Sequence, residues 1–158
     1  MAYDDLKGTA KAVALAFDDW SSSTPQAHWT APVADVAPYE PGAFYKRELP
    51  CLLAVLELVT VPMDVIIVDG HGWLNQRPGL GHHLFLALDA EIPVVGIAKR
   101  AFKNGSGIPV VRGSSSRPLF VSASGMSHAA AANCVGQMHG PNRLPTMLQL
   151  VDALTKEH

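Results

Sequence analysis

Three acidic side chains in separate parts of the sequence have the character of ligands for a divalent cation. Asp69 ends a short apolar run and is followed by glycine, Glu48 stands at the start of a leucine-rich segment, and Asp152 lies close to the C-terminus. Mg²⁺ binds a few carboxylates together with water and phosphate oxygens. Two such ions about 3.5–4 Å apart neutralise a phosphodiester and activate the attacking water. The three acids are therefore candidates for metal-dependent phosphodiester cleavage.

Each of these acids also has an ordinary structural explanation. An Asp before Gly often only forms a turn, and a Glu early in a helix favours the helix dipole. Asp152 fits a solvated acid on the surface of a helix. Taken one at a time, these residue types do not distinguish a metal ligand from an ordinary structural acid. The distinction depends on the helices and strands that position them.

The pattern of apolar residues predicts a strand hairpin followed by alternating helices and strands. A helix is expected after the prolines at 38–42, because Leu49, Leu52, Leu53, Leu56 and Val59 recur at helical spacing. The expected strands cover residues 11–20, 26–36, 64–70, 93–98, 108–112 and 118–122, and the other expected helices cover residues 84–88, 129–138 and 145–156.

This order predicts one α/β domain over residues 1–158, with a mixed sheet flanked by helices. Ligand sites in such sheets lie at the carboxyl ends of parallel strands. Asp69 and Lys99 each stand at the end of an apolar strand. We therefore expect an acid and a base in the same crevice.

Composition excludes some classes of protein and leaves others open. The net charge of −2 argues mildly against binding nucleic acid through a broad basic surface, although phosphate contacts through divalent ions stay compatible with it. No apolar run reaches the roughly 18 residues of a membrane helix, and residues 1–13 lack the features of a signal peptide. We expect a cytoplasmic protein with no membrane partner, in which Cys51 and Cys134 are reduced thiols.

Four segments in a fixed order resemble the signature blocks of the endonuclease V family. They are PYEPGAFYKRE at 38–48, VDGHG at 68–72, GIAK at 96–99 and RLPTMLQLVD at 143–152. The first two blocks are long and unusual, and the resemblance runs from about Tyr3 to the C-terminus. The resemblance implies a ribonuclease H-like fold and Mg²⁺-dependent hydrolysis, with Mn²⁺ as an alternative, of DNA or RNA near deaminated purines, above all hypoxanthine.

The resemblance also implies roles for individual residues. Glu48, Asp69 and Asp152 match the positions that bind the metal, and Lys99 matches the lysine beside the scissile phosphate, where an ammonium stabilises developing negative charge. The resemblance further implies two groups of residues that bind nucleic acid. A wedge that enters the duplex beside the lesion contains Tyr39, Pro41 and Gly42, and the turn that lines the pocket for an extruded base contains Gly70, His71 and Gly72.

The match breaks at the first strand of the family, which ends in an Asp that bridges the metals. Residues 1–3 align just after that Asp, so the first strand is expected to be missing. Either the true start lies upstream of Met1, or the chain is a truncated paralogue. A missing central strand leaves buried backbone groups unpaired at about 1–3 kcal/mol each, which predicts low stability or association through strand edges. Asp4 and Asp5 are weaker candidates to replace the absent Asp.

Three hypotheses about function follow. The first is a metal-dependent endonuclease, and the second is a catalytically impaired paralogue that binds inosine-containing strands without cutting them. The third is a phosphoesterase of small nucleotides, which would not need Tyr39. A zinc site at His71, His82 and His83 is disfavoured by their spacing. Well-known members of the family carry a histidine soon after the GHG turn, and Asn75 lies near that place.

Overall fold

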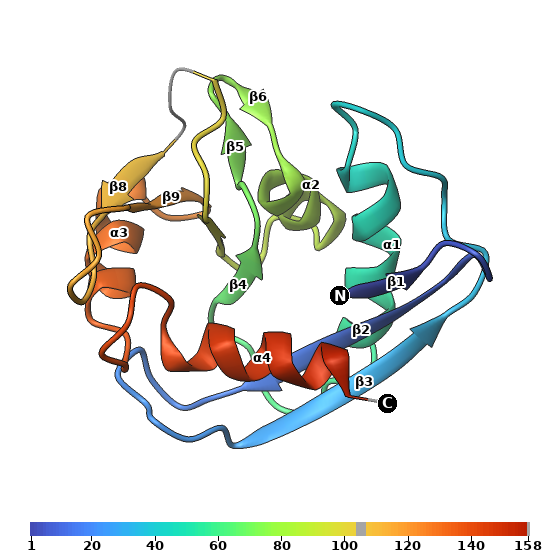
Figure 1. The fold of residues 1–158 in the computed structure, drawn as a ribbon, viewed down its shortest axis with the longest axis horizontal. Helices are drawn as coiled ribbons and strands as arrows, with labels where there is room; N and C mark the ends of the chain where they lie inside the picture. The colour runs from blue at the N-terminus through green and yellow to red at the C-terminus, as the bar shows by residue number, and fades with distance from the viewer. Residues whose placement is uncertain (104–106, 158) are drawn as a thin grey trace.

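The computed structural model describes residues 1–103 and 107–157, which form two main sheets and four helices (Figure 1). An antiparallel sheet near the N-terminus has the order β1-β2-β3, and a second sheet has the order β4-β7-β9-β8. The strands are β1 (Ala2–Asp4), β2 (Thr9–Ala16), β3 (Ala27–Val33), β4 (Ile66–Asp69), β5 (Trp73–Leu74), β6 (Arg77–Pro78), β7 (Val94–Ala98), β8 (Ile108–Val110) and β9 (Leu119–Ser124).

The predicted hairpin is present as β2 and β3, paired antiparallel from Ala10↔Val33 to Ala16↔Ala27. β1 pairs with the start of β2 over only three residues, Ala2↔Lys11 to Asp4↔Thr9. β2 therefore has a long paired edge against β3 and a short paired edge against β1.

The second sheet holds the apolar strands whose ends carry the candidate site. β4 and β7 are parallel, with Asp69 opposite Ile97, and β9 pairs antiparallel with both β7 and β8. All five residues of β7 are buried. A strand buried on both faces reads as a continuous apolar run, which explains why this strand was predictable.

The helices cover the two sheets. α1 (Tyr45–Leu56) packs against β2, β3 and α2 (Leu80–Ala87), while α2 also packs against β7. α3 (His128–Gly136) covers β8 and β9, and α4 (Thr146–Lys156) crosses β2. Ser127 caps α3 through its side chain, which accepts a hydrogen bond from the N–H of Ala130.

The predicted mixed α/β fold with flanking helices is confirmed, with one correction. The strands do not join into a single sheet in the described residues, because β2 and β4 are not hydrogen-bonded to each other. The two-stranded β5–β6 ribbon was not predicted, since strands of two residues leave no period to read. Cys51 and Cys134 are both free thiols. No helix in residues 1–103 or 107–157 has the length and apolar character needed to cross a membrane.

Candidate active site

The carboxyl ends of β4 and β7 bring an acid and a base into contact. Asp69 is the last residue of β4, and Lys99 directly follows β7. The Lys99 Nζ donates to Asp69 Oδ2 at 3.1 Å, with both side chains about two-fifths exposed at 41% and 42%. The expectation that these residues lie together is confirmed, and an ammonium is held beside a carboxylate that solvent can reach.

Glu48 approaches the same place from the first turn of α1. Burial raises the pKa of the Glu48 carboxyl, and the charge of Asp69 raises it further. The α-ammonium of Met1 and the guanidinium of Arg47 oppose these effects. The negative charges of two carboxylates from separate elements thus repel each other, and a cation would relieve this repulsion.

Asp152 lies on α4 and has a partner of its own. Its carboxylate accepts a hydrogen bond from Lys156 Nζ at 2.7 Å. This hydrogen bond lowers the pKa of Asp152, and the charge of Lys99 contributes in the same direction. No group of three His, Cys, Asp or Glu side chains in the described part of the chain is placed to hold a metal ion. The assignment of Glu48, Asp69 and Asp152 as ligands therefore stays a prediction.

The turn after β4 is fixed in place by backbone hydrogen bonds and close packing. The N–H of Gly70 donates to Ile97 O, while the carbonyls of His71 and Gly72 accept from the first N–H groups of α2. A Cβ on Gly96 would lie 2.2 Å from Gly72 N and 2.7 Å from Gly70 O. The turn Gly70–His71–Gly72 thus lies directly on β7, at a distance that only glycine allows.

Ser122 on β9 is a supporting residue that the sequence did not reveal. Its Oγ accepts hydrogen bonds from the N–H groups of Gly72 at 3.0 Å and Trp73 at 3.1 Å. The Trp73 indole donates to Ala123 O. Nothing in the sequence marks one serine inside a mostly apolar strand, because its role depends on a register across two strands.

Aromatic and imidazole rings surround this turn. His71 is partly buried, burial lowers its pKa, and its ring lies edge-on to Phe102 with centroids 6.3 Å apart. His82 is hydrogen-bonded to Ser124 Oγ at 2.7 Å, and His83 stacks on Tyr45 at 3.7 Å. The three imidazoles thus have separate neighbours.

The predicted wedge lies in the loop between β3 and α1. Tyr39 is 58% exposed and packs edge-on against Phe44, which is itself 50% exposed. Pro41 is exposed, and Gly42 has a positive φ of 77°, which the loop requires at that turn. An aromatic pair therefore projects into solvent from a proline-stiffened loop next to the helix that holds Glu48.

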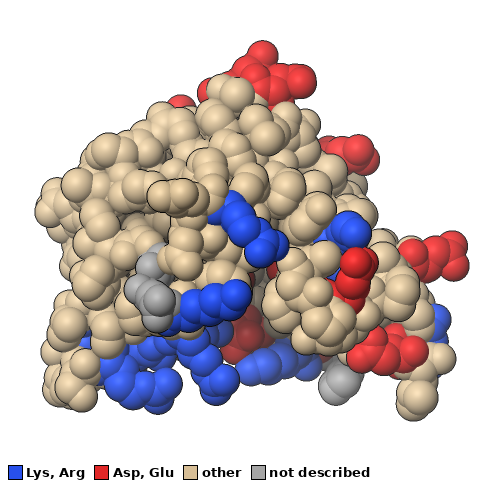
Figure 2. All heavy atoms as spheres, turned by 90° about the horizontal axis from the view of Figure 1, so that it is seen from above, with Lys and Arg blue, Asp and Glu red and all other residues tan. Residues whose placement is uncertain are grey.

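A basic side chain, that of Arg143, lies beside Lys99. Figure 2 shows Lys and Arg side chains gathered along the lower part of that view, with acidic side chains among and beside them. Arg143 links this region by donating to the carbonyl oxygens of Lys99, Arg117 and Pro118. The chain as a whole has a net charge of −2.

The fold and site together define a mixed α/β protein of the ribonuclease H-like type, with an acid–lysine pair at the carboxyl ends of two adjacent parallel strands. The family model described as Endonuclease V matches residues 1–110. The Endonuclease V of Streptomyces coelicolor is 32% identical over 130 residues, which are 82% of this chain. The chain belongs to the endonuclease V family.

Solved structures agree with this assignment. A crystal structure of Endonuclease V from Streptomyces avermitilis superposes with a TM-score of 0.72 and 25% identity, covering 95% of this chain and 80% of that one. A Ciona intestinalis Endonuclease V, solved in complex with inosine-containing DNA, gives a TM-score of 0.72 at 16% identity, covering 94% of this chain and 84% of that one. The chain spans only about half the length of the curated relatives, 54% and 56%.

Proposed function

We propose that this chain contributes to hydrolysis of a phosphodiester near a deaminated base, hypoxanthine above all, in DNA or RNA, with Mg²⁺ or Mn²⁺ as cofactor. The observation that supports the proposal best is the contact of Asp69 with Lys99 at 3.1 Å, at the ends of two parallel strands. An acid and a lysine in one accessible crevice suit phosphoryl chemistry, which needs bound cations and a counter-charge at the phosphate.

The donor set fits a divalent cation. Glu48 and Asp69 offer hard oxygen ligands, and the pKa of Glu48 is raised by burial and by Asp69. A bound cation would supply charge neutralisation and an activated water. Glu48 and Asp69 would hold it, with Asp152 as a further ligand once its contact with Lys156 opens. Lys99 would place its ammonium against a non-bridging phosphate oxygen.

The substrate class follows from two features outside the acidic residues. Tyr39 projects from its loop and can stack where a base has left the duplex. Gly70, His71 and Gly72 form a rigid turn beside Phe102, against which an extruded base can lie. The Ciona intestinalis relative of similar fold was solved with DNA that contains inosine.

A second candidate function is binding without cleavage. It is favoured by one observation, which is that the described residues gather no three metal-ligating side chains of the His, Cys, Asp and Glu types. In that case Tyr39, the Gly70–Gly72 turn and Lys99 would still bind an inosine-containing strand. Binding and cleavage must therefore be measured separately.

The test compares both activities on one oligonucleotide. A labelled strand with a single inosine is incubated with Mg²⁺ and the chain, and a strand with adenosine at that position serves as the substrate control. The first function predicts cleavage near inosine that Asp69→Asn reduces by at least about a hundredfold, because the substitution removes a ligand charge at the scissile phosphate.

A matched control is Asp64→Asn, since Asp64 is exposed and lies just before the same strand. It should leave cleavage unchanged. Selective binding of the inosine strand without cleavage would replace the first function by the second. Equal treatment of inosine and adenosine strands would contradict both.

A further inference from the structure

The carbonyl oxygen of Lys99 is held by a guanidinium from a distant part of the chain. The ladder between β7 and β9 ends at the pair Ala98↔Phe120, so Lys99 is the first residue beyond it. Pro118, just before β9, has no N–H with which to extend that ladder. Arg143 instead joins the two strand ends, because its Nη2 donates to the carbonyl oxygens of Lys99 and, at 3.0 Å, of Pro118.

The same guanidinium has a third acceptor, and all three acceptors are main-chain carbonyls. Arg143 Nε donates to Arg117 O at 2.9 Å. Within residues 1–103 and 107–157, Arg143 takes no part in an ion pair. The planar fork of a guanidinium suits several acceptors in fixed directions, whereas the ammonium of a lysine is a point charge on a flexible stem. The contacts of Arg143 therefore fix the geometry of two strand ends and do not neutralise an acid.

A second arginine, Arg112, holds the segment that carries Arg143. Arg112 is only 6% exposed, and its Nη1 donates to the carbonyl oxygens of Asn142 at 3.0 Å and Arg143 at 3.2 Å. Its Nη2 donates to the carbonyl oxygens of Met138 and Gly140. The loop between α3 and α4 is thus tied to one buried side chain at four carbonyls, and the backbone of Arg143 is one of them.

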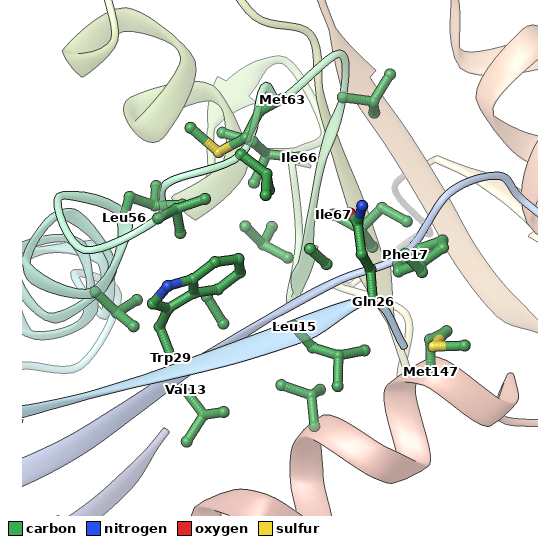
Figure 3. Close-up of a pocket in the computed structure, with 18 of the residues that line it drawn as sticks. Val13, Leu15, Phe17, Gln26, Trp29, Leu56, Met63, Ile66, Ile67 and Met147 are labelled. Atoms are coloured by element: carbon green, nitrogen blue, oxygen red, sulfur yellow. The ribbon is translucent and has the colours of Figure 1, made fainter. Parts of the chain in front are cut away.

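The other side of the Asp69–Lys99 pair gives less support. Asp69 lines a largely apolar cavity of about 490 Å³ between β2 and β4. Figure 3 shows Leu15, Ile67 and Met147 around this cavity. Groups beside a cavity lack part of the contacts that close packing supplies. The placement of the pair therefore depends on what holds Lys99.

We propose that Arg143 is a positioning residue for Lys99, and that it is held in turn by Arg112. The proposal rests on the proposed function, in which the Lys99 ammonium lies against a phosphate oxygen. Arg143 fixes the backbone of Lys99 at the end of β7, which sets the point from which the side chain reaches Asp69 at 3.1 Å. A misplacement of about 1 Å in such a group costs up to about a hundredfold in rate.

Lysine side chains labelled with ¹³C report the surroundings of Lys99 without any cleavage. The ¹³Cε resonance of Lys99 is identified by its loss in Lys99→Arg. Asp69→Asn gives the shift of this resonance that follows when the contact between Asp69 and Lys99 is lost. Arg143→Gln should move the resonance in the same direction and by a comparable amount, because the carbonyl of Lys99 loses its donor.

The matched control is Arg117→Gln. Arg117 is exposed and lies at the same strand end, and only its carbonyl oxygen contacts Arg143. The substitution removes one guanidinium charge beside the site and leaves that carbonyl in place. It should leave the Lys99 resonance unmoved.

Cleavage kinetics on the inosine strand separate positioning from a direct contact with nucleic acid. Arg143→Lys keeps the charge but cannot reach three carbonyls, so positioning predicts a kcat about ten- to a hundredfold lower, with KM within about twofold of the parent. A direct phosphate contact predicts instead that Arg143→Lys keeps its kcat. Arg112→Lys should also lower kcat, and adding it to Arg143→Lys should cause little further loss, because both act on one path.

A Lys99 resonance that moves in Arg143→Gln and stays in Arg117→Gln supports the proposal. An unmoved resonance, equal movement in both variants, or a full kcat in Arg143→Lys overturns it. If circular dichroism shows that Arg143→Gln does not fold, Arg143→Lys takes its place in the resonance measurement with the same expected shift. A moved resonance in a chain that leaves the inosine strand uncut places the failure in the proposed function. Cleavage by the parent together with an unmoved resonance places the failure in the role of Arg143.

Discussion

The two sheets of this molecule are packed very differently. The buried residues around the β4-β7-β9-β8 sheet include Val95, Ile97, Leu119 and Val121, all at 0% exposure, and α3 and α4 add further apolar side chains. The buried cluster of the β1-β2-β3 sheet consists of three alanines, Cys51 and Val55. Larger side chains bury more apolar area and stabilise more strongly. The N-terminal sheet therefore depends for its stability on packing against neighbouring elements, while the other sheet is stabilised by its own larger buried cluster.

The candidate site spans this difference. Asp69, Lys99 and the turn Gly70–Gly72 belong to the dense sheet, whereas Glu48 sits on α1, which packs on β2 and β3. α1 also contacts α2, and α2 is anchored on β7. The distance between Glu48 and Asp69 thus depends on how firmly the weaker sheet is held. Four predictions test or sharpen this contrast.

The largest effect is expected at Gly96 in β7. In Gly96→Ala the new Cβ would lie 2.2 Å from Gly72 N, so the backbone of the turn must move. Overpacking usually costs about 1–3 kcal/mol, and a clash with three backbone atoms of the same turn places this change at about 4 kcal/mol. Chemical denaturation monitored by circular dichroism measures the loss.

The control for this prediction is Gly136→Ala in α3, where the added Cβ meets nothing nearer than Val110 Cγ1 at 4.0 Å. It should be neutral or stabilise by up to about 1 kcal/mol, since alanine favours a helix over glycine. A Gly96→Ala protein as stable as the parent would show that the turn is not packed against β7 as described.

The second prediction compares one leucine from each region. Leu119 in β9 is 0% exposed, so Leu119→Ala should cost about 3 kcal/mol. Leu15 in β2 borders the cavity and is only partly buried. Leu15→Ala should cost about 1 kcal/mol, because fewer contacts are lost. Equal losses in urea denaturation would mean that the two sheets are equally well packed.

Much of the dense sheet could be predicted from the sequence, and the reasons are physical. The runs that became β4 and β7 are apolar and end at Asp69 and Lys99, so both the strands and their shared end could be read from composition. α1 was marked by leucines at helical spacing, although Pro50 lies within it. The local pattern of apolar residues was sufficient to predict an element wherever that element is buried by its immediate neighbours.

The gap between the sheets and the supports of the site could not be predicted in the same way. The missing pairing between β2 and β4 is a property of strand order rather than of any local pattern. Ser122 contacts Gly72 and Trp73 about fifty residues away. The close approach of Gly96 to Gly72 likewise depends on the parallel register of β4 and β7.

The third prediction concerns Ser122. Ser122→Ala leaves the N–H groups of Gly72 and Trp73 without their acceptor, in a region where the serine is 2% exposed. Each unpaired buried donor costs about 1–3 kcal/mol, and partial access of water sets the total at about 2 kcal/mol. Thermal unfolding measures it, with the variant Ser116→Ala, at an exposed loop position, expected to stay within about 0.5 kcal/mol. Matching losses for the two variants would count against a rigid turn.

The smallest effect is a dependence on pH that originates at Glu48. Burial and the charge of Asp69 raise the pKa of this carboxyl above its ordinary value of 4.5. The folded state therefore favours the neutral form of Glu48. The contribution of this group to the free energy of unfolding is fully present below pH 4.5 and is lost as pH rises through the folded-state pKa. Glu48→Gln removes this loss, so the substituted protein should gain melting temperature relative to the parent as pH rises above 4.5.

The difference in melting temperature between the parent and Glu48→Gln isolates the contribution of Glu48. Other groups give a pH dependence in the opposite direction, such as Asp152, whose pKa is lowered by Lys156. Glu57→Gln at an exposed position one residue beyond α1 is the matched control and should track the parent at every pH. Mg²⁺ should raise the melting temperature of the parent near neutral pH and leave Glu48→Gln nearly unchanged, because the cation would offset the repulsion between Glu48 and Asp69. A parallel response of both proteins to pH and to Mg²⁺ would show that α1 does not hold Glu48 against Asp69, and that the weaker sheet leaves the two halves of the site apart.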